Sequence, residues 1–118
     1  MENTFGESTR QLKVARQIQK DISELFLREC AEMVRGVIVS VTTVRVSPDL
    51  ENARIYLSIF PFAKHEEVMA RIEADKWKIR RLLGERMRNQ LRVVPEINFF
   101  LDDSLEYIEN IDSLLKEE

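Results

Sequence analysis

The sequence has one cysteine, one histidine, three glycines and three prolines, and it lacks any apolar run long enough to cross a membrane. A single cysteine excludes an intramolecular disulfide, which fits a reducing compartment, and the first residues have no basic region followed by an apolar one, as a secretory signal would. No Cys–His or Ser–His–Asp set can be assembled, and Walker, GxGxxG and paired CxxC motifs are absent. We therefore expect a cytoplasmic protein that is not an enzyme and needs no cofactor or metal.

Three residues that could carry chemistry have simpler structural interpretations. His65 is expected to be an exposed loop residue, Cys30 a small, partly buried apolar residue, and Trp77 a packing anchor. Base stacking by Trp77 is the alternative. Asp102 and Asp103 could hold a metal ion in principle, but no histidine or suitably spaced carboxylate accompanies them.

Charge is segregated along the chain. The 118 residues carry a net charge of −3, yet residues 102–118 hold seven acids and one base, which leaves 17 bases against 14 acids in residues 1–101. A chain of this length can bury about two-thirds of its unfolded surface in one core. We therefore expect one mildly cationic domain over residues 1–101, followed by an acidic tail or short helix over residues 102–118.

Hydrophobic periodicity predicts the order helix, strand, strand, helix, helix, strand. The first helix opens at Ser8 or Thr9 with capping-box spacing, carries an apolar stripe over about 25 residues, and lies in a helical region that ends at Gly36. Two strands, 37–46 and 53–60, follow as an antiparallel hairpin with a bulge near residues 42–43. Further helices are expected at 64–73 and 76–91, the second opened by Asp75, and a third strand at 97–101.

The segment 76–92 holds seven basic residues against one acid, Glu85. On a helix with about 100° per residue, four of the cations share the outward face: Lys78, Arg81, Arg88 and Arg92. Only Arg81 has a well-placed partner, Glu85, so a solvated face of ion pairs explains the pattern less well than contact with nucleic-acid phosphates. Arg80 and Arg86 flank the apolar stripe and are expected to be structural. A second group of cations lies opposite the stripe of the first helix: Lys13, Arg16 and Lys20.

Three segments closely resemble the ribosome-binding factor A family of bacterial ribosome-maturation proteins: RQLKVARQIQKDISELF, VTTVRVSPDLENARIYLSIF and IRRLLGERMRNQLRVVPEINFFLDDSLE. The resemblance covers nearly the whole chain. It implies an α+β, single-domain, type II KH-like fold of order α-β-β-α-α-β, with helices packed on one face of a three-stranded sheet. The third strand would lie parallel to the first, after a crossover through the second and third helices.

The resemblance also implies a function in ribosome biogenesis. Such proteins bind the 30S small ribosomal subunit and its 16S rRNA, and they assist late maturation, rRNA processing and growth in the cold. No membrane or small-molecule substrate is implied, and we expect a monomer. The RNA-binding residues that we predict from the resemblance and the charge pattern are Lys13, Arg16, Lys20, Lys76, Lys78, Arg81, Arg88 and Arg92.

The sequence departs from the family at the kink between the second and third helices. The family usually has Ala-x-Gly there in place of the GxxG loop of true KH domains, whereas this chain reads Ala74-Asp75-Lys76. Lys76 would thus add a cation at the RNA-facing corner.

A protein–protein adaptor is the alternative function. Leu105, Ile108, Ile111 and Leu115 recur at helical spacing in the acidic tail, so this segment could dock as a helix in the groove of a partner.

Overall fold

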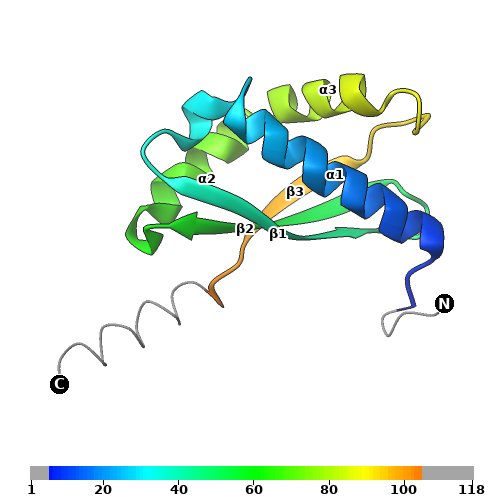
Figure 1. Cartoon of the computed structure of the whole chain (residues 1–118), viewed down its shortest axis with the longest axis horizontal. Helices are drawn as coiled ribbons and strands as arrows, with labels where there is room; N and C mark the ends of the chain where they lie inside the picture. The colour runs from blue at the N-terminus through cyan, green and yellow to red at the C-terminus, as the bar shows by residue number, and fades with distance from the viewer. Residues whose placement is uncertain (1–5, 105–118) are drawn as a thin grey trace.

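The computed structural model describes residues 6–104, and Figure 1 shows their arrangement. The elements are α1 (Thr9–Leu27), β1 (Ile38–Val46), β2 (Asn52–Phe60), α2 (His65–Ala74), α3 (Lys76–Met87) and β3 (Glu96–Leu101), with 3₁₀ turns at Ala31–Val34 and Phe62–Lys64. The predicted order of helices and strands is therefore confirmed. The acidic tail or short helix expected over residues 102–118 lies outside the described residues, except for residues 102–104. No helix in the described range could span a membrane.

The sheet has the order β1-β2-β3, with β1 antiparallel to β2 and β3 parallel to β2. The prediction that the third strand lies parallel to the first is therefore wrong. One reason is that α1 lies over β1 (Figure 1), and two of its glutamines donate to β1 carbonyls. Gln11 Nε2 is 2.8 Å from the Val46 oxygen, and Gln19 Nε2 is 2.8 Å from the Val41 oxygen. The free edge of β2 is thus the position left for β3.

The hairpin confirms the predicted bulge. Its register shifts between Val41 and Thr43, and Thr42 donates its hydroxyl to the Tyr56 oxygen at 3.3 Å. Because the bulge adds one residue to β1, the alternation of inward and outward side chains shifts by one position there, and the apolar side chains on both sides of the bulge still point into the core.

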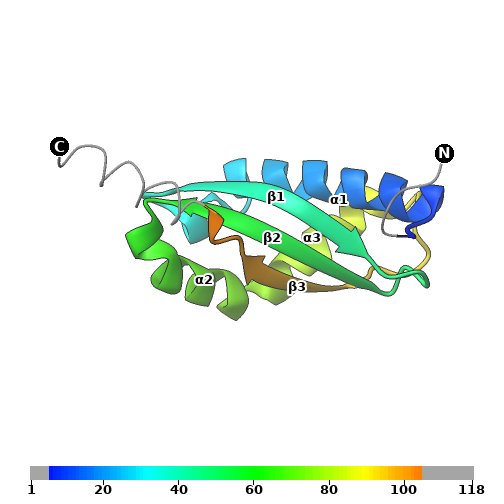
Figure 2. The ribbon, with the colours of Figure 1, turned by 90° about the horizontal axis from the view of Figure 1, so that it is seen from below.

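The helices cover one face of the sheet, as predicted (Figure 2). The core between the layers contains fully buried residues from both, among them Ile18 and Ile22 of α1, Ile55 of β2, and Ile79 and Leu83 of α3. Five such side chains contribute roughly 1.5–3 kcal/mol each when removed from water, so burial is the main force that holds the helices to the sheet.

Helix α1 begins with the predicted capping box but ends earlier than predicted. The Ser8 hydroxyl accepts from the Gln11 N–H at 3.1 Å, and the Gln11 side chain accepts from the Ser8 N–H at 2.7 Å. The helix stops at Leu27, and Cys30 and Met33 reach the core through the following turns. The 19-residue α1 and the nine-residue β1 each span roughly 30 Å, so they match in length when packed side by side. The chain must therefore turn back after Leu27 to enter β1.

Helix α3 also ends before the predicted residue, at Met87 instead of Leu91. The chain must leave the helix axis there because Leu91 and Pro95 are both buried on the way to β3. The connecting loop packs tightly on α3: a Cβ added to Gly84 would lie 2.8 Å from Val94 Cγ2. Only a residue without a side chain allows this approach without a shift of Val94.

Helices α2 and α3 meet at Asp75, where the expected break occurs without the expected cap. The backbone leaves the helical region at φ −110° and ψ 22°, but the Asp75 side chain accepts no capping hydrogen bond. His65 is the first residue of α2 and not an exposed loop residue. Its ring stacks on Phe62 at 4.3 Å between centroids, and its Nδ1 lies 2.8 Å from the Phe62 oxygen.

Candidate nucleic-acid interface

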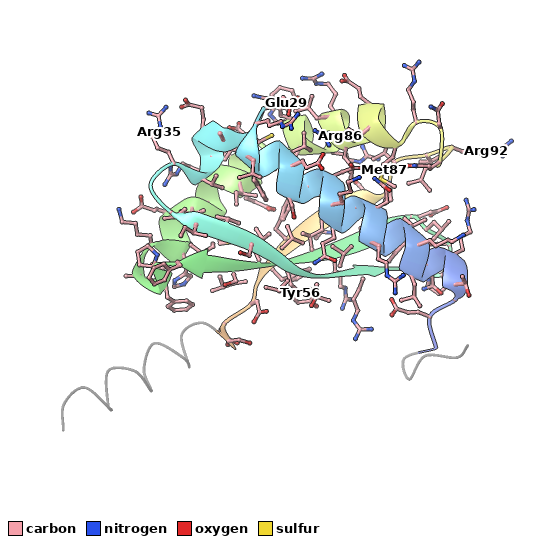
Figure 3. The ribbon with its side chains drawn as sticks, in the orientation of Figure 1. Glu29, Arg35, Tyr56, Arg86, Met87 and Arg92 are labelled. Atoms are coloured by element: carbon pink, nitrogen blue, oxygen red, sulfur yellow. The ribbon has the colours of Figure 1, made fainter. Side chains whose placement is uncertain are left out.

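Arg86 of α3 joins this helix to α1 through contacts with Asp21 and Glu24; its position is labelled in Figure 3. Its Nη1 lies 2.5 Å from Glu24 Oε1 and 3.4 Å from the Asp21 carboxylate, and its Nη2 lies 4.0 Å from Glu29. The Arg86 hydrogen bond lowers the pKa of Glu24 and raises that of Arg86 itself. Arg86 is therefore structural, as the sequence predicted, and its charge is used within the fold.

Arg80 has a comparable role on the other side of α3. Its guanidinium donates to the Val94 oxygen at 2.8 Å and to the Pro95 oxygen at 3.0 Å. These two bonds fix the loop that leads into β3. The prediction that Arg80 is structural is confirmed.

The cations predicted to share the outward side of α3 differ in what they contact. Lys78 Nζ lies 3.4 Å from the Glu29 backbone oxygen, and Arg81 pairs with Glu85 at 3.0 Å, as predicted. Arg88 is exposed and has no hydrogen bond or ion pair within residues 6–104. The prediction that Arg92 shares this helix face is wrong, because α3 ends at Met87. Arg92 lies in the following loop and points away from the body of the protein (Figure 3).

Lys76 is held by neighbouring side chains. Its Nζ lies 3.2 Å from Glu73 and 3.3 Å from Asn98 Oδ1, so it connects the start of α3 to β3. The predicted extra cation is therefore at the corner, but part of its charge is neutralised.

The three predicted cations of α1 are exposed, and one of them, Lys13, lies close to the end of α3. Lys13, Arg16 and Lys20 are all exposed, and none has a hydrogen bond or ion pair in the described part of the chain. Lys13 and Met87 line the same hollow of about 410 Å³, together with Arg10 and Gln90. The fold thus brings two basic groups that are distant in sequence onto the same helical layer.

Trp77 is not the predicted packing anchor, because 66% of its surface is exposed. It lines a hollow of about 290 Å³ with Arg81, Gly84 and Val94. The sequence contained the signal: Trp77 precedes the buried Ile79 by two positions, which turns it about 160° away from the core.

Cys30 is buried, and this burial raises the pKa of its thiol despite the nearby Lys78. Within residues 6–104, no group of histidine, cysteine and acidic side chains is arranged to hold a metal ion. The Asp102 carboxylate instead accepts a hydrogen bond from the Ser104 backbone N–H at 3.0 Å, and hydrogen bonds from Ser104 lower the pKa of Asp102.

The fold and its cationic helical layer define a small α+β protein of the type II KH-like class. The sequence model described as "Ribosome-binding factor A" matches residues 10–115, and the chain belongs to this family. The chain is 43% identical to the ribosome-binding factor A of Cytophaga hutchinsonii over 92% of this chain and 82% of that protein. It is 40% identical to the ribosome-binding factor A of Christiangramia forsetii, over 93% of this chain and 85% of that protein. Ribosome binding, and not catalysis, is the function that the family name states.

Solved structures confirm the fold. The crystal structure of ribosome-binding factor A from Thermus thermophilus aligns with a TM-score of 0.66 at 16% identity, over 77% of this chain and 94% of that one. The solution structure of a putative ribosome-binding factor A from Thermotoga maritima aligns with a TM-score of 0.64 at 21% identity, over 85% of this chain and 93% of that one. A homology model of the Thermus thermophilus protein has been fitted into a cryo-EM map of its 30S complex. It aligns with a TM-score of 0.62 at 18% identity, over 75% of this chain and 91% of that one.

Proposed function

We propose that this protein binds the small ribosomal subunit through its 16S rRNA, in the cytoplasm, and assists late maturation of that RNA. The contact surface is the exposed side of α1 and α3 with the adjoining loop. The predicted RNA contacts remain Lys13, Arg16, Lys20, Lys76, Lys78, Arg81, Arg88 and Arg92. The observation that carries the proposal is the set of exposed cations without protein partners in the described region: Lys13, Arg16, Lys20, Arg88 and Arg92.

The internal electrostatics support this surface. Asp21 and Glu24 lie between the helices and would repel phosphate, but Arg86 contacts both. The neighbouring free cations can therefore neutralise RNA phosphates, and each phosphate so contacted releases a counterion. The relatives' name and the 30S complex of the Thermus thermophilus protein agree with this partner.

Co-sedimentation with purified small subunits at two salt concentrations tests the proposal, with large subunits as the control. We expect binding specific for small subunits that weakens steeply as salt rises, because phosphate contacts release counterions. The variant Arg88→Glu/Arg92→Glu should bind more weakly and with a shallower salt dependence, and it should retain its melting temperature because neither side chain has a partner in the described chain.

The control is Arg35→Glu/Arg71→Glu, which changes the net charge equally but breaks the exposed ion pairs of Arg35 with Glu32 and of Arg71 with Glu67, so the melting temperature of this variant is measured as well. Arg35 lies far from Arg92 (Figure 3), and Arg71 lies on α2. Equal binding by the two double variants would contradict the proposed surface. If the wild-type protein bound neither subunit, the adaptor function of the acidic tail would become the better explanation.

A further inference from the structure

The outer face of the sheet, which is the face away from the helices, has a different chemical character from the helical layer. In Figure 2 the strands lie in front of α1 and α3. The register places Arg54 of β2 beside Asn98 of β3, and Tyr56 beside Phe100. The residues between them, Ile55 among them, point into the core. The outer face therefore carries aromatic rings, amides and guanidinium groups on adjacent strands.

The two aromatic rings form a stacked pair. The centroids of Tyr56 and Phe100 are 5.4 Å apart, and their planes differ by 28°. Phe100, the next-to-last residue of β3, is 41% exposed, which is a large exposed area for a phenylalanine in a strand. The Phe100 ring does not contribute to the core between sheet and helices, because the neighbouring Phe99 is the buried residue at this point of β3.

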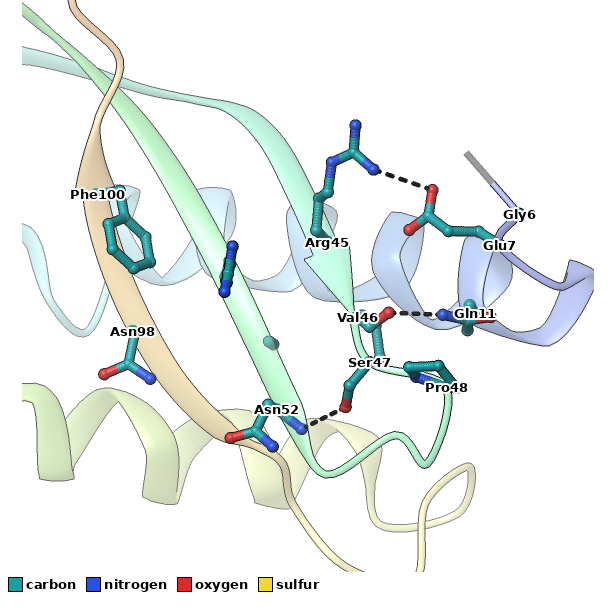
Figure 4. Close-up of a pocket in the computed structure, with 12 residues that line it drawn as sticks. Gly6, Glu7, Gln11, Arg45, Val46, Ser47, Pro48, Asn52, Asn98 and Phe100 are labelled. Atoms are coloured by element: carbon teal, nitrogen blue, oxygen red, sulfur yellow. Dashed lines mark hydrogen bonds and ion pairs between the residues drawn. The ribbon is translucent and has the colours of Figure 1, made fainter. Parts of the chain in front are cut away.

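A hollow of about 610 Å³ adjoins Phe100 (Figure 4). Arg54, Asn52 and Asn98 contribute to its lining. Arg54 is exposed and has no hydrogen bond or ion pair in the described part of the protein, whereas Arg45 at the rim lies 3.7 Å from Glu7. Asn98 uses its oxygen to accept from Lys76, which leaves its amide N–H groups as donors.

We propose that the outer face of the sheet binds a single-stranded segment of RNA. A base stacks on Phe100, the amides of Asn52 and Asn98 contact base edges, and Arg54 contacts the adjoining phosphate. Exposed aromatic rings on a sheet, flanked by cations, are the elements from which proteins build surfaces for unpaired bases. The inference rests on the proposed function for the identity of the RNA, and it adds a second surface opposite the helical layer.

Charge on this face also indicates where the phosphate lies. Asp102 and Asp103 line a second hollow with Tyr56, beyond the aromatic pair, and exposed Glu96 lies beside Asn52 at the other end of β3. These carboxylates repel phosphate, whereas Arg54 between them attracts it, so the phosphate contact should be centred on Arg54. An acidic peptide could also pair with Arg54, but it would make no use of the stacked rings and the paired amides.

The experiment measures binding of a labelled single-stranded RNA of about ten nucleotides by fluorescence anisotropy. Phe100→Ala and Arg54→Ala should each weaken binding, and the loss for Phe100→Ala should be about ten-fold, as expected for one stacked base. The matched control is Phe60→Ala, an exposed phenylalanine at the end of β2, four positions beyond Tyr56 and on the side away from Arg54 and Asn52. Melting temperatures establish that all three variants are folded.

An oligonucleotide of the same length with abasic sites separates stacking from phosphate attraction. Phe100→Ala should leave its binding unchanged, whereas Arg54→Ala should weaken it. Wild-type affinity of both variants for the normal oligonucleotide would overturn the inference. Displacement of the RNA by a peptide of sequence 105–118, with loss of peptide binding in Phe100→Ala, would also overturn it and assign the face to the chain's own tail.

Co-sedimentation of the same variants keeps the two proposals distinct. If wild-type protein binds the oligonucleotide in a Phe100-dependent way but does not bind small subunits, the proposed function fails and the surface stands. If it binds small subunits but the oligonucleotide is insensitive to Phe100 and Arg54, the surface fails and the proposed function stands.

Discussion

Arg86 on α3 lies 3.4 Å from the carboxylate of Asp21 on α1, a side chain that is almost completely buried. Gln17 also donates to this carboxylate, at 3.1 Å. A charged group is stable inside a protein only if partners replace the water it has lost. The contact between these two residues therefore fixes how α1 and α3 lie against each other, and with them the basic side chains on both helices.

Replacement of Arg86 by glutamine should destabilise the protein. Asp21 would lose its cation while still buried, and we expect the free energy of unfolding to fall by about 1–3 kcal/mol. The control is Arg88→Gln, two residues along the chain, which removes the same charge from an exposed position without a partner in residues 6–104. Its effect should stay within about 0.5 kcal/mol. Urea unfolding measures both, and equal losses would show that Arg86 has no special structural role.

Acid should destabilise the fold. The pKa of Glu24 is lowered by its hydrogen bond from Arg86, and that of Asp49 by the Ser47 hydroxyl and the Glu51 N–H. Because each carboxyl has a lower pKa in the folded state, its contribution is complete above the ordinary values of 4.5 and 3.8 and is lost as the pH falls through the folded values.

Melting temperatures recorded from neutral pH downward would measure this loss. In Glu24→Gln the decline below the ordinary pKa should be shallower than in wild type. A decline of equal steepness would show that Glu24 does not take part.

Substitution of Gly84 by alanine tests the close packing of α3 on the following loop. The new methyl group would meet Val94 at 2.8 Å, so we expect destabilisation even though alanine favours helix by about 1 kcal/mol. In a Val94→Ala background the obstructing methyl groups are absent, and Gly84→Ala should become neutral or stabilising. A double-mutant cycle by urea unfolding measures the coupling. Additive effects would mean that the loop moves away freely.

Trp77 should report binding at the helical layer. It is the only tryptophan in the chain, it is exposed, and it lines a hollow with Arg81. Ribosomal RNA bound to this layer would change its surroundings, so we expect quenching or a shift of the tryptophan emission on addition of small subunits. The short oligonucleotide bound at the outer face of the sheet should produce a smaller change. No change with small subunits would place the interface away from α3.

The elements could be predicted from the sequence because local patterns determine them. The β-branched strands, the capping box at Ser8 and the bulge near Thr42 depend on neighbouring residues. The errors arose where tertiary packing decides. Helix α3 ends at Met87 because Leu91 must turn into the core, and β3 pairs with β2 because α1 occupies the edge of β1.

The candidate site shows the same division. Helical periodicity predicted that Arg80 and Arg86 are structural, since both flank the apolar stripe of the third helix. Lys76 contacts Glu73, across the helix break, and Asn98, on β3. Its hydrogen bond to Asn98 depends on tertiary packing and therefore could not be predicted. The pair of Tyr56 and Phe100 could not be predicted for a similar reason: it depends on the pairing of β2 with β3, whereas the third strand was expected to lie parallel to the first.

The glutamine contacts from α1 to β1 have a consequence for the behaviour of the protein at high concentration. An uncovered strand edge offers carbonyl and N–H groups to any other extended chain, and this is a common route to aggregation. Gln11 and Gln19 occupy two carbonyls of β1 from above. A second molecule could therefore not continue the sheet at this edge without first displacing α1, so the helix that carries basic side chains also protects the β1 edge of the sheet.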